Sequence, residues 1–313
     1  MALTILYGSS ISVKTEKLYD RILREAALHP ERSYVLLVPE QASLYVQGEM
    51  VRRAPSHALL NIDILTFNRL AYRVFSDFPG EKHTALDDIG KRMLLRIVLR
   101  EQEKELHVLS RNLKKEGFLD ELQSVFSELA EYNVSPQRLK EGAEALSSHP
   151  GLQAKLSEIA LIYDAFLERL HRNYEMAEER LTRLSERLPA WPAASKTVFA
   201  LTGFTGFTPP QEAVIRALLR QSPDILLTAD LGSGRSIEDQ KQEDDLFHMS
   251  YVMCARTKAL AAGLGCPVFE ETVTEEKPVS AAVRAIERGL FAWRKEKASA
   301  EDAKDLRIVK AAM

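Results

Sequence analysis

The sequence is poor in cysteine and has no excess of positive charge. Its 313 residues include only Cys254 and Cys266, which is too few for a disulfide framework or for a four-thiolate zinc or iron–sulfur site. The 42 lysines and arginines are balanced by 45 aspartates and glutamates, so the net charge is -3. This balance excludes a generally basic nucleic-acid coat, although it allows a local basic stripe.

Long apolar stretches are also missing. No run is long enough to cross a bilayer, and the opening MALTILYGSS lacks the basic flank and the length of a signal peptide. We therefore expect a cytoplasmic protein with no membrane partner. The histidines show no metal-ligand spacing and no nucleophile motif occurs, so we predict neither a metal site nor a catalytic residue.

The chain does have enough apolar residues for a core, because 45% of it is hydrophobic. In its first and last parts, apolar runs of strand length alternate with segments of helical periodicity. Strands are predicted at 3–7, 33–38, 62–66, 196–201, 224–228 and 267–269. Helices are predicted at 14–27, 41–53, 68–75, 209–220, 246–262 and 281–293. This alternation is typical of a parallel sheet with crossover helices.

The middle of the chain has a different pattern. Between 84 and 188 almost no strand signal remains, and helices are predicted around 94–99, 118–129, 152–170 and 181–188, with Pro136 and the stretch 147–151 as separators. We therefore predict a RecA-like α/β core at 1–82 and 193–313, interrupted by an all-helical insertion domain at 83–192. Residues 306–309 look like the start of another strand, so we expect a piece of a longer protein.

A phosphate-loop pattern follows the first predicted strand. Residues 8–15 are GSSISVKT, where the phosphate loop requires G-x-x-x-x-G-K-[ST]. Gly8, Lys14 and Thr15 fit this pattern, and Ser12 lies in the loop whose backbone N–H groups would hold phosphates. Val13 replaces the second glycine. Its branched side chain is expected to resist the backbone angles that glycine allows, and its methyl groups would crowd a phosphate. The pattern predicts a degenerate nucleotide site; the alternative is a plain strand–turn–helix joint with a solvated Lys14.

A nucleotide-hydrolysing core also needs an acidic residue at the end of a later strand, where it holds the metal. The strand at 196–201 is followed by Thr202, which is not acidic. Asp230 follows the next strand, and either it serves the metal or it starts a turn. The two defects together predict a site that does not hydrolyse ATP.

Six stretches spread along the chain form an ordered series. They are LYGSSISVKT, YVLLVPEQASLYVQGEM, ILTFNRLAYRVF, GKRMLLRIVLRE, LTGFTGFTPPQEAVIRALL and LRIVKAAM. In this series nearly the whole chain resembles the N-terminal part of AddB (RexB), the B subunit of AddAB helicase–nucleases. The resemblance implies a superfamily 1 helicase-like region that has lost its motor. It implies an AddA-like partner subunit, processing of double-strand DNA ends for recombinational repair, and a part in recognising Chi sequences.

The resemblance also bears on cofactors. The family's nuclease and iron–sulfur cluster lie near the C-terminus of the full-length protein, so it implies no cofactor for this sequence. Many relatives keep the second phosphate-loop glycine. Val13 departs from them, which argues against even regulatory binding of ATP and magnesium.

Residues after the third predicted strand are candidate contacts for DNA. They are Phe67, Asn68, Arg69, Tyr72 and Arg73. Aromatic stacking combined with arginine–phosphate contact suits a single-stranded DNA track. The alternative is that Phe67 belongs to the core and the arginines are ordinary surface charges.

A basic stripe is predicted on the first helix of the insertion. Lys91 and Arg92 begin it, and Arg92, Arg96 and Arg100 are four residues apart, so these arginines share one face. Such a stripe could meet a run of backbone phosphates. The alternative is a solvated face balanced by the glutamates that follow it. Later in the insertion, a solvated acidic helix face is predicted from Glu175, Glu178 and Glu179.

Three functions remain open from the sequence. The first is a DNA-binding scaffold with an inactive ATP site. The second is a genuine ATPase that uses Lys14 and Thr15. The third is a protein-interaction module whose helical insertion docks a partner.

Overall fold

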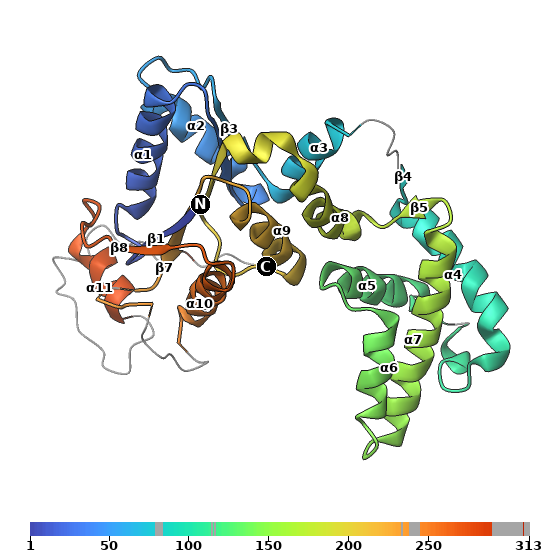
Figure 1. Cartoon of the computed structure of the whole chain (residues 1–313). Helices are drawn as coiled ribbons and strands as arrows, with labels where there is room; N and C mark the ends of the chain where they lie inside the picture. Colours follow the sequence, from blue (N-terminus) through green and yellow to red (C-terminus); the bar gives the residue numbers. More distant parts are fainter. Residues whose placement is uncertain are drawn as a thin grey trace. The chain divides into compact units, whose positions relative to one another are not determined.

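The computed structural model describes residues 1–78, 84–113, 115, 117–232, 234–237, 245–289 and 309. The chain divides into two compact units. Unit 1 comprises Met1–Leu70, Leu188–Phe207 and Ile215–Met313, and unit 2 comprises Ala71–Arg187 and Thr208–Val214. Unit 1 contains an α/β sheet and unit 2 is mostly helical (Figure 1). No helix in the described ranges is long and apolar enough to span a membrane.

Unit 1 is built on one parallel sheet, which has six strands within the described residues. They are β1 (Ala2–Gly8), β2 (Ser33–Leu37), β3 (Ile62–Leu65), β6 (Thr197–Leu201), β7 (Asp224–Asp230) and β8 (Val268–Thr272). Their order across the sheet is β3-β2-β6-β7-β1-β8, and every neighbouring pair is parallel. The predicted α/β class is confirmed, and the sheet is consistent with a RecA-like fold.

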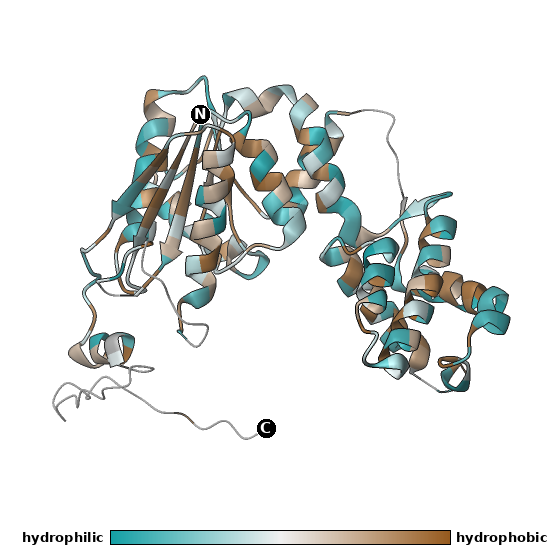
Figure 2. Ribbon diagram, turned by 60° about the horizontal axis from the view of Figure 1, so that its bottom comes forward, coloured by the Kyte–Doolittle hydropathy of each residue, from teal (hydrophilic) through white to brown (hydrophobic). Residues whose placement is uncertain are grey.

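Helices cover both faces of this sheet. They include α1 (Lys14–Leu28), α2 (Ser43–Arg53) and α10 (His248–Gly263). Unit 1 also contains α11 (Ala281–Gly289) and the short 3₁₀ turns η1 (Glu40–Ala42), η5 (Leu188–Ala190) and η6 (Pro192–Lys196). On one face, Leu18 of α1 and Met50 of α2 are buried in one cluster with strand residues such as Leu36. On the other face, α10 packs against β1, β7 and β8. Because both faces are covered, the inner strands are buried along nearly their whole length and are mostly hydrophobic (Figure 2).

Unit 2 is a group of helices with one short pair of strands. Its elements are β4 (Thr84–Ala85), α4 (Asp88–Gln102), η2 (Glu103–Glu105), η3 (Ser110–Asn112), α5 (Phe118–Glu131), α6 (Pro136–Glu144), α7 (Pro150–Leu170), β5 (Tyr174–Glu175), η4 (Ala177–Glu179) and α8 (Arg180–Arg187). Phe126 of α5 packs against Tyr163 and Phe166 of α7, with ring centroids 4.7 and 5.4 Å apart. Two further helices, α3 (Phe67–Ser76) and α9 (Pro209–Leu219), each have residues in both units.

The structure corrects two details of the predicted elements. Pro136 was expected to separate helices, but it begins α6, where Ser135 caps the helix by accepting the N–H of Arg138 at 3.2 Å. Proline is well suited to a first helical position because the N–H it lacks would have no partner there. The pair β4–β5 was not predicted, since two-residue strands carry no periodicity. Residues 290–293 and 306–308 of the predicted terminal helix and strand lie outside the described residues.

A buried carboxylate holds the loop after η2. Glu158 of α7 accepts the backbone N–H groups of His107, Val108 and Leu109, each at 2.8 Å. Burial raises the pKa of Glu158, but these three hydrogen bonds outweigh it, and the pKa lies below its ordinary value of 4.5. The carboxylate therefore stabilises unit 2 in its charged form.

We expect Glu158→Gln to lower the free energy of unfolding by about 2 kcal/mol at pH 7, because hydrogen bonds to a charged acceptor are lost. A depressed pKa gives stability that is present above the unfolded value and is lost as the pH falls through the folded value. The difference from the parent chain should therefore shrink below about pH 4. Urea unfolding of both chains at pH 7 and below about pH 4 measures this difference in the free energy of unfolding. The exposed Glu168→Gln on the same helix is the control, and an equal loss there would contradict the account.

Candidate nucleotide and DNA sites

The phosphate-loop residues lie between β1 and α1, at the carboxyl edge of the sheet, where open α/β sheets usually bind ligands. Lys14 is 4% exposed. Its Nζ donates to the carbonyl of Ser9 at 2.8 Å and to Oγ of Ser12 at 3.4 Å, and it forms an ion pair with Asp230. Gly8 is paired with Asp230 in the β1–β7 register, which brings the carboxylate to the lysine. The alternative of a solvated Lys14 is wrong.

The segment after β8, residues 273–277, lies against the phosphate loop, and we call it the strap. The N–H of Val13 donates to the carbonyl of Glu275 at 2.9 Å, and the N–H of Lys277 donates to the carbonyl of Ile11 at 2.8 Å. Within the loop, the N–H of Ser12 donates to the carbonyl of Ser9 at 3.0 Å. The strap thus engages the N–H of Val13 and the loop itself engages the N–H of Ser12, two donors that a phosphate ligand would otherwise find.

The structure shows why glycine is needed at position 8 beside the strap and why valine fits at position 13. A Cβ placed on Gly8 would lie 2.4 Å from the carbonyl oxygen of Val273, so glycine is required for the strap to come this close. Val13 has φ of -82° and ψ of 21°, which any residue adopts. The expectation that a branched residue resists the backbone angles of this position is wrong.

Thr202 lies where a nucleotide-hydrolysing core would carry an acidic residue, and its hydroxyl is hydrogen-bonded to the hydroxyl of another threonine. Oγ1 of Thr228 donates to Oγ1 of Thr202 at 2.7 Å, and both side chains are buried. Asp230 is engaged by Lys14, while Lys14, Thr15, Thr202 and Asp230 all line a cavity of about 200 Å³. Among the described residues, no group of three or more His, Cys, Asp or Glu is placed to hold a metal ion.

The first group of candidate DNA contacts lies along α3. Phe67 is buried, and its ring packs edge-on against Phe204 and Phe207, with centroids 5.6 and 6.4 Å away. Asn68 donates from Nδ2 to Glu40 at 2.9 Å. The ring of Phe67 is therefore part of the core in this structure, as the alternative interpretation expected.

The other residues of α3 differ in their availability. Arg69 is exposed and Arg73 is half-buried. Tyr72 is 60% exposed, but the guanidinium of Arg180 lies 4.6 Å from the centre of its ring. Of this group, Arg69 is the cation that is most open to solvent.

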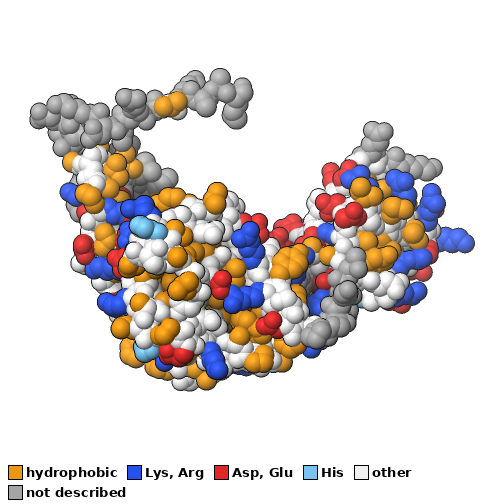
Figure 3. All heavy atoms as spheres, turned by 90° about the horizontal axis from the view of Figure 1, so that it is seen from above, with side chains coloured by type: hydrophobic (Ala, Val, Ile, Leu, Met, Phe, Trp, Pro, Cys, Tyr) orange, Lys and Arg blue, Asp and Glu red, His pale blue; other side chains and the backbone are white. Residues whose placement is uncertain are grey.

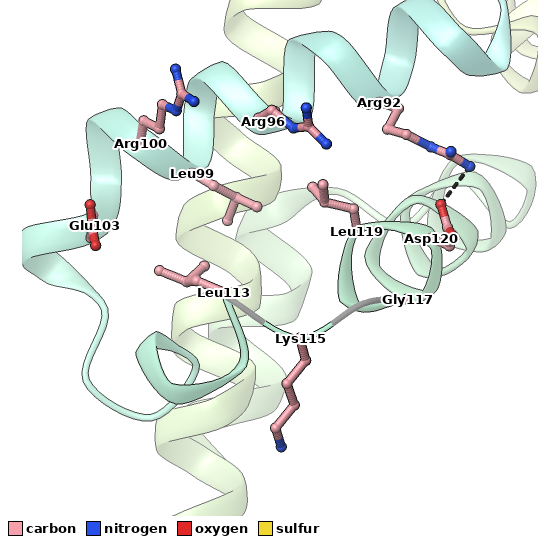
Figure 4. Close-up of a pocket in the computed structure, with 10 residues that line it drawn as sticks. All are labelled: Arg92, Arg96, Leu99, Arg100, Glu103, Leu113, Lys115, Gly117, Leu119 and Asp120. Atoms are coloured by element: carbon pink, nitrogen blue, oxygen red, sulfur yellow. Dashed lines mark ion pairs between the residues drawn. The ribbon is translucent and has the colours of Figure 1, made fainter.

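The second group of candidates forms the predicted row on α4. Arg92, Arg96 and Arg100 are all exposed. Arg92 is paired with Asp120 at 2.5 Å, whereas no ion pair joins Arg96 or Arg100 to another described residue. The row lines a pocket of about 730 Å³ beside the start of α5 (Figure 4). A contact between this row and DNA stays a prediction.

Comparison with known proteins supports the resemblance. Residues 5–287 match the family described as "ADDB, N-terminal". The chain belongs to this family. Among AddB relatives, the ATP-dependent helicase/deoxyribonuclease B subunit of Lachnoclostridium phytofermentans is 33% identical over 83% of this chain and 23% of its own length. The protein of the same name from Desulforudis audaxviator is 31% identical over 100% of this chain and 27% of its own length. The chain thus spans about a quarter of these relatives.

One predicted member of the basic stripe, Lys91, does not lie on the exposed face of α4. Lys91 is buried and donates to both carboxylate oxygens of Glu178, at 2.7 and 3.0 Å. Because successive helical residues point about 100° apart, Lys91 faces inward while Arg92 faces solvent. Glu178 was expected on a solvated acidic face together with Glu175 and Glu179. Instead, these carboxylates pair with Lys91, Arg183 and His171, respectively.

Sequence reasoning did not find the strap or its role. Residues 273–277 read VTEEK, which matches no ligand-binding pattern. The single available signal was the run of acidic residues around them, which lies close to basic side chains of α1 in the structure. Glu275 pairs with Lys17 at 3.1 Å and Glu271 with Arg21 at 3.6 Å.

Proposed function

We propose that this chain is a DNA-binding scaffold within a helicase–nuclease B subunit that processes DNA ends in the cytoplasm, together with an AddA-like partner. In this proposal the chain neither hydrolyses ATP nor carries a nuclease or a cofactor. Family membership supports the DNA-processing role, because the relatives are named as B subunits of an ATP-dependent helicase/deoxyribonuclease. The observation that carries the loss of hydrolysis is the phosphate loop closed by the strap.

Hydrogen bonds within the chain already engage groups of this loop that would bind a phosphate. A phosphate is held by free backbone N–H groups and by the lysine at the start of the helix. Here the N–H of Val13 is bonded to Glu275, the N–H of Ser12 to Ser9, and the amine of Lys14 to Asp230. A phosphate would have to break these contacts and displace an acidic segment. The residues present therefore do not fit a nucleoside triphosphate with its metal.

Hydrolysis is tested on the chain with and without single-stranded DNA. We expect no ATP turnover above background, because the N–H groups of Ser12 and Val13 and the carboxylate of Asp230 are already engaged within the described part of the chain. Turnover that DNA stimulates and that Lys14→Ala abolishes would show that the proposal is wrong.

DNA binding is expected to be salt-dependent and to use exposed cations of unit 1. Arg69→Glu should weaken binding of single-stranded DNA and reduce the slope of log affinity against log salt by about 0.7, the value for one phosphate contact on a single strand. Fluorescence anisotropy over a salt series measures both effects. Arg24→Glu, an exposed arginine on α1 of the same unit, is the matched control. Equal losses in the two variants would mean a diffuse field and no specific contact.

A functional ATPase that uses Lys14 and Thr15 is the second candidate. The cavity that these residues line supports it, since it lies at the usual edge of the sheet. However, its volume of about 200 Å³ is below the 300–1,000 Å³ that is usual for ligand pockets. This candidate therefore requires the strap to leave the loop before a nucleotide enters.

A further inference from the structure

The solvent side of α4 carries two parallel rows of side chains. One is the arginine row, Arg92, Arg96 and Arg100. The other is an apolar row of Ile89, Met93 and Ile97, which are 70, 65 and 41% exposed. Residues four apart lie above one another on a helix, so the two rows run side by side along the same face. In Figure 3, basic and hydrophobic side chains also lie next to one another on the surface of unit 2.

The pocket beside the arginine row has an aliphatic floor. Leu99 of α4, Leu113 and Leu119 point toward one another across it, as Figure 4 shows. Its volume of about 730 Å³ is enough for several side chains of a ligand. Among the described side chains that line it, two are acidic, Glu103 and Asp120, and none is aromatic.

We propose that this face of α4 docks an amphipathic helix of a partner protein, one that carries acidic residues beside an apolar stripe. Its apolar side chains would enter the leucine pocket and cover Met93 and Ile97. Carboxylates one turn apart on the partner would meet Arg96 and Arg100, whose guanidinium groups are one turn apart on α4. Helix-in-groove recognition uses this combination of apolar anchors at helical spacing.

Charge and composition both favour a protein over DNA on this face. The chain as a whole has a net charge of -3, yet the described residues that line this pocket include four cations and two acids, so the pocket complements an acidic partner. Arginine and methionine are enriched at protein interfaces, and exposed apolar residues in a group mark interaction sites. Single-stranded DNA sites instead combine cations with aromatic stacking platforms, and no aromatic side chain is among the lining residues that the structure describes. The inference does not depend on the absence of ATP hydrolysis or on DNA binding elsewhere.

Selection from a displayed library of random peptides, each about 20 residues long and so able to form several helical turns, tests this on the full chain. The enriched peptides should share acidic residues four apart beside apolar ones. Binding of a synthesised, labelled peptide should fall at least about tenfold, or about 1.4 kcal/mol, in Arg96→Glu/Arg100→Glu and in Met93→Asp/Ile97→Asp. Arg138→Glu/Arg172→Glu, which reverses two exposed arginines elsewhere in unit 2, should bind the peptide as the parent chain does.

Three results would overturn the proposal. The first is a library that yields no enriched peptide. The second is enriched peptides whose binding neither double variant on α4 changes. The third is a single-stranded oligonucleotide that binds through Arg96 and Arg100 and is unaffected by Met93→Asp/Ile97→Asp, which would assign this face to DNA.

Discussion

Asp230→Ala is expected to lower the free energy of unfolding of unit 1 by about 3 kcal/mol. Removing one partner of a buried ion pair leaves the other charge without compensation, which typically costs about 3–5 kcal/mol. Lys14 is the buried partner, with its side chain 5% exposed, whereas that of Asp230 is 44% exposed. We expect the lower end of the range, because Lys14 keeps its hydrogen bond to the carbonyl of Ser9. Urea unfolding followed by fluorescence of Trp191, which is buried in unit 1, measures the loss.

The asymmetry of the pair gives this prediction its control. Lys14→Met removes the buried charge and leaves an aspartate that water can solvate, so it should cost much less than Asp230→Ala. The free energy of unfolding of the double variant Lys14→Met/Asp230→Ala should then be close to that of Lys14→Met alone. A double-mutant cycle detects this coupling between the two residues. If Asp230→Ala unfolds within about 0.5 kcal/mol of the parent chain, Lys14 is not held in the way described.

Glu178→Ala is expected to lower the free energy of unfolding of unit 2 by about 3 kcal/mol, because the buried ammonium of Lys91 loses its two short hydrogen bonds and keeps the more distant, exposed carboxylate of Asp88, 3.6 Å away. Burial raises the pKa of Glu178, but the hydrogen bond from Lys91 and other contacts outweigh it, and the pKa lies below its ordinary value. The contribution is therefore present at neutral pH and is lost as the pH falls through the folded pKa. Urea unfolding followed by far-ultraviolet circular dichroism at pH 7 measures the loss.

An apolar replacement of both partners separates charge burial from simple loss of packing. Lys91→Met/Glu178→Leu should recover most of the stability, since well-packed apolar pairs often replace buried ion pairs at little cost. A double variant as unstable as Glu178→Ala alone would contradict the account.

Periodicity and local motifs predicted the α/β class and most of the helices. Strands such as 33–38 are continuous apolar runs, and helices such as 14–27 carry apolar residues at helical spacing. Each of these elements can therefore be predicted from its own stretch of sequence. α6 was missed because Pro136 is a helix breaker in an interior position and a helix starter in the first turn. The sequence alone does not say which of these positions it occupies.

The candidate sites were predicted less completely because their states depend on distant segments. The GSSISVKT stretch indicates where a phosphate loop should lie, but not that Val13 bonds to Glu275. In the same way, the spacing of Arg92, Arg96 and Arg100 predicts a shared helix face. It does not predict that Asp120 pairs with one of them or that leucines of α4, of the following loop and of α5 line a pocket beside them.

The central claim is that contacts within the chain engage the phosphate-binding groups of the loop, the N–H groups of Ser12 and Val13 and the ammonium of Lys14. Calorimetric titration with ATP and magnesium tests it most directly. The parent chain and Val13→Gly are compared at nucleotide concentrations up to about 1 mM, which detects any binding free energy stronger than about -4 kcal/mol. We predict no saturable binding in either, because a glycine at position 13 would still donate its N–H to the strap. Saturable binding by the parent chain that Lys14→Ala removes, or its appearance in Val13→Gly, would contradict the claim.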